Sequence, residues 1–295
     1  ITVMHSEEKE FICSKNKNAD LFYATCGGLG LTGFITSCKL QLRKIKTTNI
    51  RSNSIKFFNL KNLLDKFDKD KNEFKVAWID GLNFSNNYKI LYESANFDKN
   101  STELQHKKIK KFKIKFFPTL LLNSFSIKTF NWFYFNFKKK GNKVYHIYDF
   151  LFNLDKIKNW NKLYGNDGFL QYQFVVPSDN AYLVINKLFE YLDNQSLKSF
   201  LIVLKKFGKS NMNHLSFPIP GITVSLDLKM NSKNKKFIND FQNSINKYGT
   251  RVYLAKDSIL NKKTFKNSYD LNKFKKVRKK YKLNNFFNSF QSLRL

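Results

Sequence analysis

The sequence predicts an α+β fold built from short strands and amphipathic helices. Runs with apolar side chains at every second position predict strands, and runs with apolar side chains at every third or fourth position predict helices. Several of the strands are candidates for antiparallel pairing. A mixture of this kind is typical of the α+β class.

Length and composition indicate a folded chain with room for two domains. The 295 residues are 42% hydrophobic and 17% aromatic, with 32 Phe, which provides ample apolar surface to bury. Because single cores usually stop growing at roughly 250 to 300 residues, two domains are the first expectation. The same composition argues against a disordered chain.

The charge balance is strongly basic. A formal net charge of +31, from 53 Lys and Arg against 22 Asp and Glu, would suggest nucleic acid or an anionic membrane as a partner. The lysines are accompanied by many Asn, Ile and Phe, the set that A/T-rich codons encode, and only 107–115 (KKIKKFKIK) is dense. We therefore favour a solvated basic surface, with membrane contact and nucleic-acid binding as the alternatives.

The cysteines and the apolar runs bear on compartment. Cys13, Cys26 and Cys38 are odd in number and form no CxxC pair, so neither a disulfide framework nor a zinc site is expected, and a reducing compartment fits. No run of 18 apolar residues is present, and the first residues do not resemble a signal peptide. The chain opens without Met in the middle of an alternating pattern, so residues are expected to precede it.

The segment 21–41 contains Gly28, Gly30 and Gly33 at the GxGxxG spacing of dinucleotide-binding proteins. That fingerprint requires a helix after the glycines and an acidic residue about 20 positions later, and neither is present. Apolar alternation from 34 to 42 predicts a strand instead. The glycines are therefore expected between a helix and a strand, where missing Cβ atoms allow close backbone approach to a ligand.

The other elements follow along the chain. Residues 43–70 are basic and polar with short apolar pieces, which favours a crossing between domains. Strands are expected at 11–13, 76–80, 88–94, 130–137, 170–177, 200–206, 221–228 and 251–255. Helices are expected at 19–25, 179–193, 237–248 and from 272 onward, with a glycine C-cap after the third of them.

Six stretches together resemble the decaprenylphosphoryl-β-D-ribose 2-oxidase family, relatives of the aldonolactone oxidases on the vanillyl-alcohol-oxidase flavoprotein fold. The stretches are ADLFYATCGGLGLTG (19–33), VAWID (76–80), GNDGFLQYQFVVP (165–177), LKKFG (204–208), LSFPIPG (215–221) and RVYLAKDS (251–258). They run in family order along nearly the whole chain, and the stretches at 165–177 and 251–258 are the most specific.

The resemblance implies an FAD-binding domain that is split in sequence around an inserted substrate domain with an antiparallel sheet and flanking helices. Residues 1–44 would be the end of the N-terminal FAD-binding portion, 45–250 the substrate domain, and 251–295 the tail that returns to the FAD domain. The pyrophosphate-binding half, with any histidine that links to the flavin, is expected upstream of this chain.

Lys256 is the catalytic candidate. The resemblance places the lysine of YLAKDS beside flavin and substrate, where a fixed cation stabilises the negative charge that a reduced flavin gains toward N1 and the C2 carbonyl. Without the motif, a solvent-exposed lysine at a strand end would be the ordinary interpretation.

The strand at 170–177 carries Gln171 and Gln173 on one face, since residues two apart project to the same side. In the family this face lines the flavin and sugar pocket; an ordinary polar sheet face is the alternative. Lys205 resembles a substrate-contacting lysine that meets a hydroxyl or phosphate oxygen. Phe207 would form an apolar wall or pack in the core.

The remaining flavin-side candidates come from the same comparison of motifs. Tyr253 resembles a flavin-contacting tyrosine. Gly30, Gly33 and Ile35 correspond to backbone that approaches the flavin, where a main-chain N–H can reach the ring carbonyls. Trp78 is placed near the substrate pocket by its motif, although a single Trp is often a core residue.

The chain departs from the family at three places. Thr223 stands where the family commonly has Asn, and Ser225 stands where many members have Cys. The stretch 148–155 (YDFLFNLD) lacks a His found in related sequences. The missing His affects the outer substrate contacts. The missing thiol affects covalent capture of nitro-aromatic inhibitors but not the oxidation itself, because Ser225 still keeps the site small.

The implied function is an FAD-dependent oxidation of the 2′-hydroxyl of a polyprenyl-phosphate-linked pentose to a ketone, as the first half of an epimerisation in cell-wall polysaccharide synthesis. A short-chain reductase would complete it, and the basic segment 107–115 could hold the protein on the inner face of the cell membrane. An aldonolactone oxidase, a basic binding module for nucleic acid or membrane, and an inactive fragment are the alternatives. No metal is expected.

Overall fold

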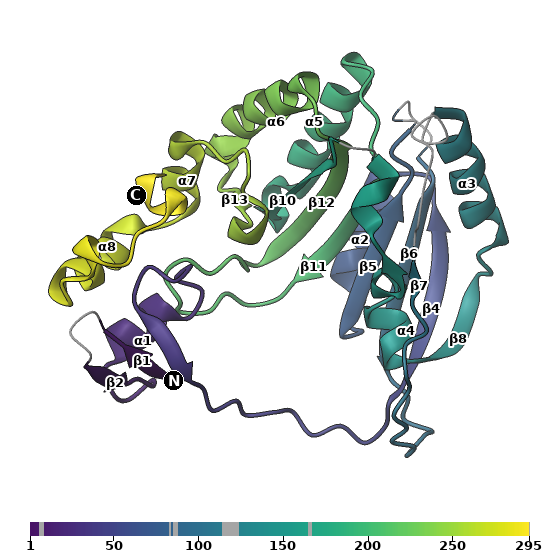
Figure 1. The fold of residues 1–295 in the computed structure, drawn as a ribbon. Coiled ribbons are helices and arrows are strands. Elements are labelled where there is room, and N and C mark those ends of the chain that lie inside the picture. The colour runs from purple at the N-terminus through teal and green to yellow at the C-terminus, as the bar shows by residue number, and fades with distance from the viewer. Residues whose placement is uncertain (6–8, 83, 85–87, 114–123, 165–166, 295) are drawn as a thin grey trace.

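The computed structural model describes residues 1–295 except 6–8, 83, 85–87, 114–123, 165–166 and 295 (Figure 1). Its main feature is an eight-stranded sheet in the order β13-β10-β12-β11-β5-β6-β4-β8, in which neighbouring strands pair antiparallel. These strands are β4 (Asn49–Phe57), β5 (Phe74–Ile79), β6 (Ile90–Phe97), β8 (Gly141–His146), β10 (Phe169–Pro177), β11 (Leu201–Phe207), β12 (Gly221–Lys229) and β13 (Arg251–Val252).

The helices surround this sheet. They are α1 (Ala19–Thr25), α2 (Leu60–Lys69), α3 (Ser124–Phe137), α4 (Ile147–Leu151), α5 (Ala181–Asn194), α6 (Ser232–Ile245), α7 (Lys262–Ser268) and α8 (Leu271–Lys280). Helices α2, α5 and α6 contribute buried apolar side chains to the same core cluster as β10, β11 and β12. Antiparallel strands with helices on their faces confirm the predicted α+β class.

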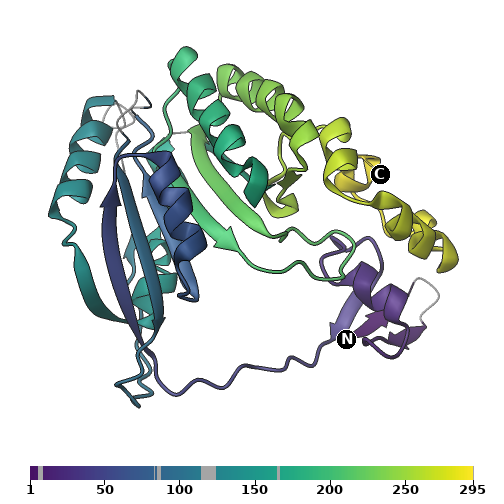
Figure 2. The ribbon, with the colours of Figure 1, turned by 180° about the vertical axis from the view of Figure 1, so that it is seen from behind.

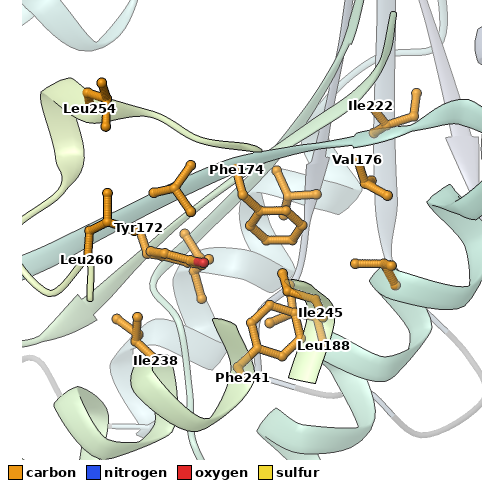
Figure 3. Packing of buried hydrophobic residues seen from close by; sticks show 14 of the residues in the cluster. Tyr172, Phe174, Val176, Leu188, Ile222, Ile238, Phe241, Ile245, Leu254 and Leu260 are labelled. Carbon is orange, nitrogen blue, oxygen red and sulfur yellow. The ribbon is translucent and has the colours of Figure 1, made fainter. Parts of the chain in front are cut away.

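The core lies between the helices and one face of the sheet, as Figure 3 shows. Tyr172 and Phe174 of β10 meet Phe241 of α6, with ring centroids of Phe174 and Phe241 5.6 Å apart. Leu188 of α5 lies in the same layer and is fully buried. Because alternate residues of β10 fill this layer, the residues between them must face the other side of the sheet.

A smaller unit forms from the two ends of the chain. Strands β1 (Thr2–Met4), β2 (Glu10–Ile12) and β3 (Phe34–Ser37) make a sheet in the order β2-β1-β3, and α1 packs beside α8 (Figure 1). The Asp20 carboxylate accepts from Lys280 Nζ at 2.6 Å and from Tyr281 Oη at 3.1 Å. The beginning and the end of this chain are thus joined by side-chain contacts, and the role of 251–295 as a tail that returns to the FAD domain stays a prediction.

Residues 38–48 form no helix or strand and run from the small unit to β4 (Figures 1 and 2). The predicted strand at 34–42 therefore ends early, at Ser37, and Leu40 and Leu42 are exposed. Both leucine side chains are largely exposed among the described residues, so alternation alone did not extend the strand. The expected domain boundary at 44 falls in this segment and stays a prediction, as does the boundary at 250.

Residues 43–70, expected as a crossing between domains, instead contain β4 and α2. Strand β4 buries Ile50, Ser52 and Ser54 on one side. Because two of these three inward residues are serines, the alternation between apolar and polar side chains is hidden in the sequence. Helix α2 begins at an N-cap, where the Asn59 side chain accepts from the Asn62 N–H at 3.2 Å.

The aromatic run 130–137, predicted as a strand, is the second half of α3. Asn131 and Phe135 are four residues apart and both are buried, so they mark the inward side of a helix. Aromatic residues on both sides of this run removed any clear period from the sequence, and the β propensity of aromatics pointed to the wrong element.

The predicted strand at 251–255 is shorter than expected. Strand β13 comprises only Arg251 and Val252, and Leu254–Lys256 is a turn of 3₁₀ helix. Lys256 therefore lies on a tight turn beyond the sheet edge. The basic segment 107–115 contributes β7 (Phe112–Lys113), which pairs in parallel with β9 (Ile157–Lys158); residues 114–115 lie outside the described residues.

We predict that Leu188→Ala lowers the free energy of unfolding by about 2–5 kcal/mol, because it removes a fully buried side chain from the layer shown in Figure 3. The matched variant Leu183→Ala, on the same helix at a position that is 51% exposed, should change it by less than about 0.5 kcal/mol. Urea denaturation followed by circular dichroism measures both. Equal losses for the two variants would contradict the assigned core face of α5.

Candidate active site

The polar face of three central strands brings together most of the side chains predicted from the motifs. In the register of β10, β12 and β11, Gln171 lies opposite Asp227 and Gln173 opposite Ser225. Thr223 lies opposite Lys205 on β11. Cross-strand partners project to the same side of a sheet, and this side is opposite to the core layer. The three strands thus present these polar side chains on one side of the sheet, together with Val175 and Val203, and we call this side the polar face.

Asp227 is the most buried charged group of the polar face, with 1% of its surface exposed. Gln171 Nε2 donates to its Oδ1 at 2.7 Å, and Trp160 Nε1 donates to its Oδ2 at 3.3 Å. Burial raises the pKa of Asp227, and these two hydrogen bonds together with the charge of Lys256 offset part of the effect. The structure therefore holds a carboxyl group that gains a proton more easily than an exposed aspartate.

Lys256 reaches the same surface from the turn after β13. Its Nζ lies 3.5 Å from Ser225 Oγ, and the side chain is half-buried. Burial lowers the pKa of Lys256, the charge of Lys205 lowers it further, and Asp227 acts in the opposite direction. Two lysines and one buried carboxyl thus influence one another across Ser225.

Backbone and side-chain hydrogen bonds fix the centre of the polar face. Tyr253 N–H donates to the Gln173 carbonyl at 2.8 Å and so ties the turn that carries Lys256 to β10. Gln173 Nε2 donates to Thr223 Oγ1 at 3.1 Å, and this hydroxyl donates to the Phe174 carbonyl at 3.0 Å. The buried Thr223 hydroxyl therefore has both a donor and an acceptor as partners.

An aromatic group borders the polar face on the side of the turn. The rings of Phe217 and Tyr253 are stacked with centroids 4.6 Å apart, and Phe207 meets Phe217 edge to face at 5.5 Å. Phe207 thus belongs to this aromatic group through its contact with Phe217, and its role as an apolar wall of the pocket stays a prediction. Sequence reasoning did not single out Phe217, although it lies within the recognised stretch 215–221.

Trp78 projects from β5 on the same side of the sheet as the polar face, opposite Val203. Its ring meets that of Tyr134 on α3 at 5.1 Å, and it is 8% exposed beneath that helix. Trp78 is therefore packed as a core residue beneath α3, and its place near the substrate pocket stays a prediction.

The predicted flavin-approaching residues Gly30, Gly33 and Ile35 lie outside the polar face. Gly30 follows α1 with φ +74°, and a Cβ atom there would meet no atom within 4 Å. Gly33 packs on β1, where a Cβ atom would come within 2.7 Å of the Met4 carbonyl oxygen. Ile35 pairs with Val3 across β1 and β3 and is 52% exposed. None of the contacts among the described residues joins these three to Lys256 or Gln173.

The donor set of the polar face fits one end of a flavin ring. Lys256 supplies a half-buried ammonium group, and its hydrogen bond to the Ser225 hydroxyl is long, at 3.5 Å. Such a cation suits the N1 and C2 carbonyl region of a flavin. Gln173 and Tyr253 lie beside it. No group of three or more His, Cys, Asp or Glu side chains that could hold a metal ion occurs within the described part of the chain.

Asp227 and Trp160 are the site residues that the sequence reasoning missed. Asp227 lies two positions after Ser225 in the stretch GITVSLDL, on the same side of the strand. An acidic residue in an otherwise apolar strand was the available signal, because such a group needs partners when it is buried. Trp160 comes from a separate 3₁₀ turn, Trp160–Tyr164, and only the fold brings it to Asp227.

Comparison with known proteins confirms the resemblance that the motifs indicate. The chain is 31% identical over 277 residues to decaprenylphosphoryl-beta-D-ribose oxidase of Mycolicibacterium smegmatis, in an alignment that covers 85% of this chain and 58% of that protein. The chain therefore spans little more than half the length of this relative. No protein-family model matches it.

A solved structure shows the same fold. Physcomitrella patens BBE-like 1 aligns with a TM-score of 0.59 over 97% of this chain and 63% of that chain, at 14% identity. At this identity the likeness concerns the fold alone. It agrees with the mixed architecture of helices and antiparallel sheet described above.

Asp227 gives a prediction for the pH dependence of stability. Because burial raises the pKa of Asp227 above the ordinary 3.8, the folded protein holds this proton more tightly than the unfolded chain does. The contribution of Asp227 to the free energy of unfolding should therefore decrease as the pH rises from below 3.8 through the raised pKa. The Asp227→Asn variant has no carboxyl group at this position and therefore lacks this contribution to the pH dependence of stability.

The measurement compares urea denaturation of the two proteins between about pH 3 and pH 7. The free energy of unfolding of the wild type minus that of the variant should become more negative with rising pH over this window. A difference that stays constant or grows more positive would contradict a raised pKa. Taking the difference cancels the titration of those groups that Asp227 does not influence.

Proposed function

We propose that the intact protein is an FAD-dependent oxidoreductase that oxidises the 2′-hydroxyl of a polyprenyl-phosphate-linked pentose to a ketone. The observation that carries the proposal is Lys256, held on the polar face beside Ser225 and Gln173 in a chain that is 31% identical to a decaprenylphosphoryl-beta-D-ribose oxidase. When bound, FAD would supply the hydride acceptor.

The protein side of this reaction is the placement of charge and of hydrogen bonds. Lys256, Gln173 and Tyr253 would hold the flavin ring, and the Lys256 ammonium group stabilises negative charge that develops near it. The neighbouring turn and strand are joined by the hydrogen bond from Tyr253 N–H to the Gln173 carbonyl. This bond keeps the cation in position relative to the sheet, so that no reorganisation is needed during the reaction.

The substrate side would be formed by the remaining residues of the polar face. Gln171 and Lys205 present an amide and an ammonium group, Phe207 an apolar wall, and Ser225 a small hydroxyl. An exposed Lys205 near the half-buried Lys256 creates an excess of positive charge. This excess favours a substrate that carries a phosphate over a neutral sugar lactone.

Location and partners follow from the proposed substrate. None of the described helices is long and apolar enough to cross a membrane. We propose a cytoplasmic protein, or one that is peripheral on the inner face of the cell membrane, where a polyprenyl-linked sugar would be held. A 2-keto sugar product requires a reductase to complete an epimerisation, and a short-chain reductase is the proposed partner.

Replacing Lys256 tests the catalytic assignment. In the longest natural form of the protein, Lys256→Ala should slow flavin reduction by substrate by at least about 10²-fold, because a fixed charge beside the reacting groups is lost. Stopped-flow absorbance in the flavin bands measures the rate, and circular dichroism checks the fold. The matched variant Lys263→Ala, at an exposed position on α7, should reduce at the wild-type rate. A normal rate for Lys256→Ala would overturn the assignment.

The choice of substrate is tested separately. A polyprenyl-phosphate pentose should bleach the flavin absorbance under anaerobic conditions, whereas a soluble aldonolactone should leave it unchanged. Lys205→Ala should raise the concentration of the phosphate-bearing substrate that is needed for half-maximal reduction by about tenfold, since one charge-assisted contact is removed. Faster bleaching by the lactone would favour an aldonolactone oxidase instead.

A further inference from the structure

Within the described part of the chain, helix α3 contacts the sheet through one side, which carries Asn131, Tyr134 and Phe135. On its inner side, Asn131 Nδ2 donates to Asp80 Oδ1 at 2.6 Å, and the Phe135 ring lies beneath Lys56 Nζ at 4.9 Å from its centroid. The pair between Lys138 and Glu93, at 3.0 Å, anchors the chain just after the helix. These contacts set the rotation of α3 about its axis and thereby determine which side chains point outward.

The outer side of α3 is aromatic. Trp132, Phe133 and Phe137 are 48%, 50% and 70% exposed. Phe125, which lies about two to three helical turns earlier, is 78% exposed. The rings of Trp132 and Phe133 lie 5.0 Å apart between centroids, and those of Phe133 and Phe137 lie 5.5 Å apart. We call these four residues the aromatic ridge. Soluble proteins rarely leave a contiguous apolar surface of this kind uncovered.

Positive charge accompanies the aromatic ridge. From 104 to 148 the sequence contains 11 Lys and no Asp or Glu. Lys128, Lys139, Lys140 and Lys143 are exposed on α3 and directly after it. Such a combination of Trp and Phe with lysines matches the boundary between the acyl chains and the head groups of an anionic bilayer. Aromatic rings partition into this boundary, and lysines pair with anionic head groups.

Two other occupants agree less well with the structure. A second copy of this chain would bring its lysines against those of the first, because a two-fold interface pairs the same surface with itself. The segment before Ile1 would enter at the small unit, and α3 lies at the opposite end of the molecule in both views (Figures 1 and 2). Charge and placement therefore both favour a lipid surface.

We propose that the aromatic ridge and its lysines form the surface by which this protein docks on an anionic lipid bilayer. The inference deepens the proposed peripheral location, on which it rests, and names the contact surface. Trp132 enters the head-group boundary with Phe133 and Phe137, while Lys139 and Lys140 face the anionic head groups. Docking through α3 leaves the polar face and the small unit outside the bilayer contact.

The test is flotation of the protein with lipid vesicles. Vesicles that contain phosphatidylglycerol should bind the wild type at least about tenfold more strongly than vesicles of phosphatidylcholine alone. The variant with Trp132→Ala, Phe133→Ala and Phe137→Ala should lose binding by about tenfold or more. Lys139→Glu with Lys140→Glu should remove most of the preference for phosphatidylglycerol.

A matched control removes exposed aromatic residues outside α3, in the segment that follows α8. Phe286→Ala with Phe290→Ala removes rings that are 61% and 91% exposed and should leave vesicle binding unchanged. Brominated phospholipids should quench the tryptophan fluorescence of the wild type, and the Trp132→Phe variant should lose the quenched part. Trp78 should not contribute to it, since it is buried beneath α3. Circular dichroism and thermal unfolding confirm that each variant folds.

Several outcomes would overturn the proposal. They are a wild type that does not float with phosphatidylglycerol vesicles, equal binding by the aromatic variant, and concentration-dependent self-association that the aromatic variant loses. Flavin reduction is measured in parallel for the longest natural form of the protein. Loss of vesicle binding with normal reduction separates a failure of the docking surface from a failure of the oxidase proposal.

Discussion

The pairing register of β10, β12 and β11 is the constraint on which the rest of this structure depends. It runs without interruption from Phe169 opposite Lys229 to Pro177 opposite Gly221, and β11 extends it on the other side of β12. Side chains alternate along each strand, so a shift by one residue would turn Gln173 into the core and Phe174 onto the polar face. Burial of the apolar set against α5 and α6 therefore also positions the polar set.

The polar face combines groups that are costly to bury with the partners that make burial possible. Asp227 is nearly inaccessible and accepts from Gln171 and Trp160, so its charge is solvated by donors instead of water. Lys256 lies close enough to influence its pKa, and the two residues form no direct ion pair among the described contacts. A separated pair of this kind leaves the ammonium group available to a ligand, whereas a closed salt bridge would neutralise it.

The two ends of the large sheet serve different purposes. At one end lies the small unit, in which the beginning of the chain is joined to α8 near its end through Asp20, Lys280 and Tyr281. At the other end α3 lies far from the small unit (Figure 2). It covers Trp78 and exposes its outer aromatic side. The polar face lies on β10, β12 and β11 of the same sheet.

The sequence by itself determined the α+β class and most strands and helices, because the periodicity of apolar side chains is local. The motifs singled out Gln171, Gln173, Lys205, Thr223, Ser225 and Lys256, whose roles stay predictions, whereas Asp227 of the polar face was missed. Only the tertiary structure decided the helical state of 130–137, where aromatics on every side hide the period. The same holds for β4, whose inward serines break the alternation, and for Trp160 beside Asp227, since contacts between distant segments leave no local trace. Gly30, Gly33 and Ile35 were assigned to the flavin by resemblance alone. None of the contacts among the described residues joins them to Lys256, because they belong to the small unit, which is joined to α8.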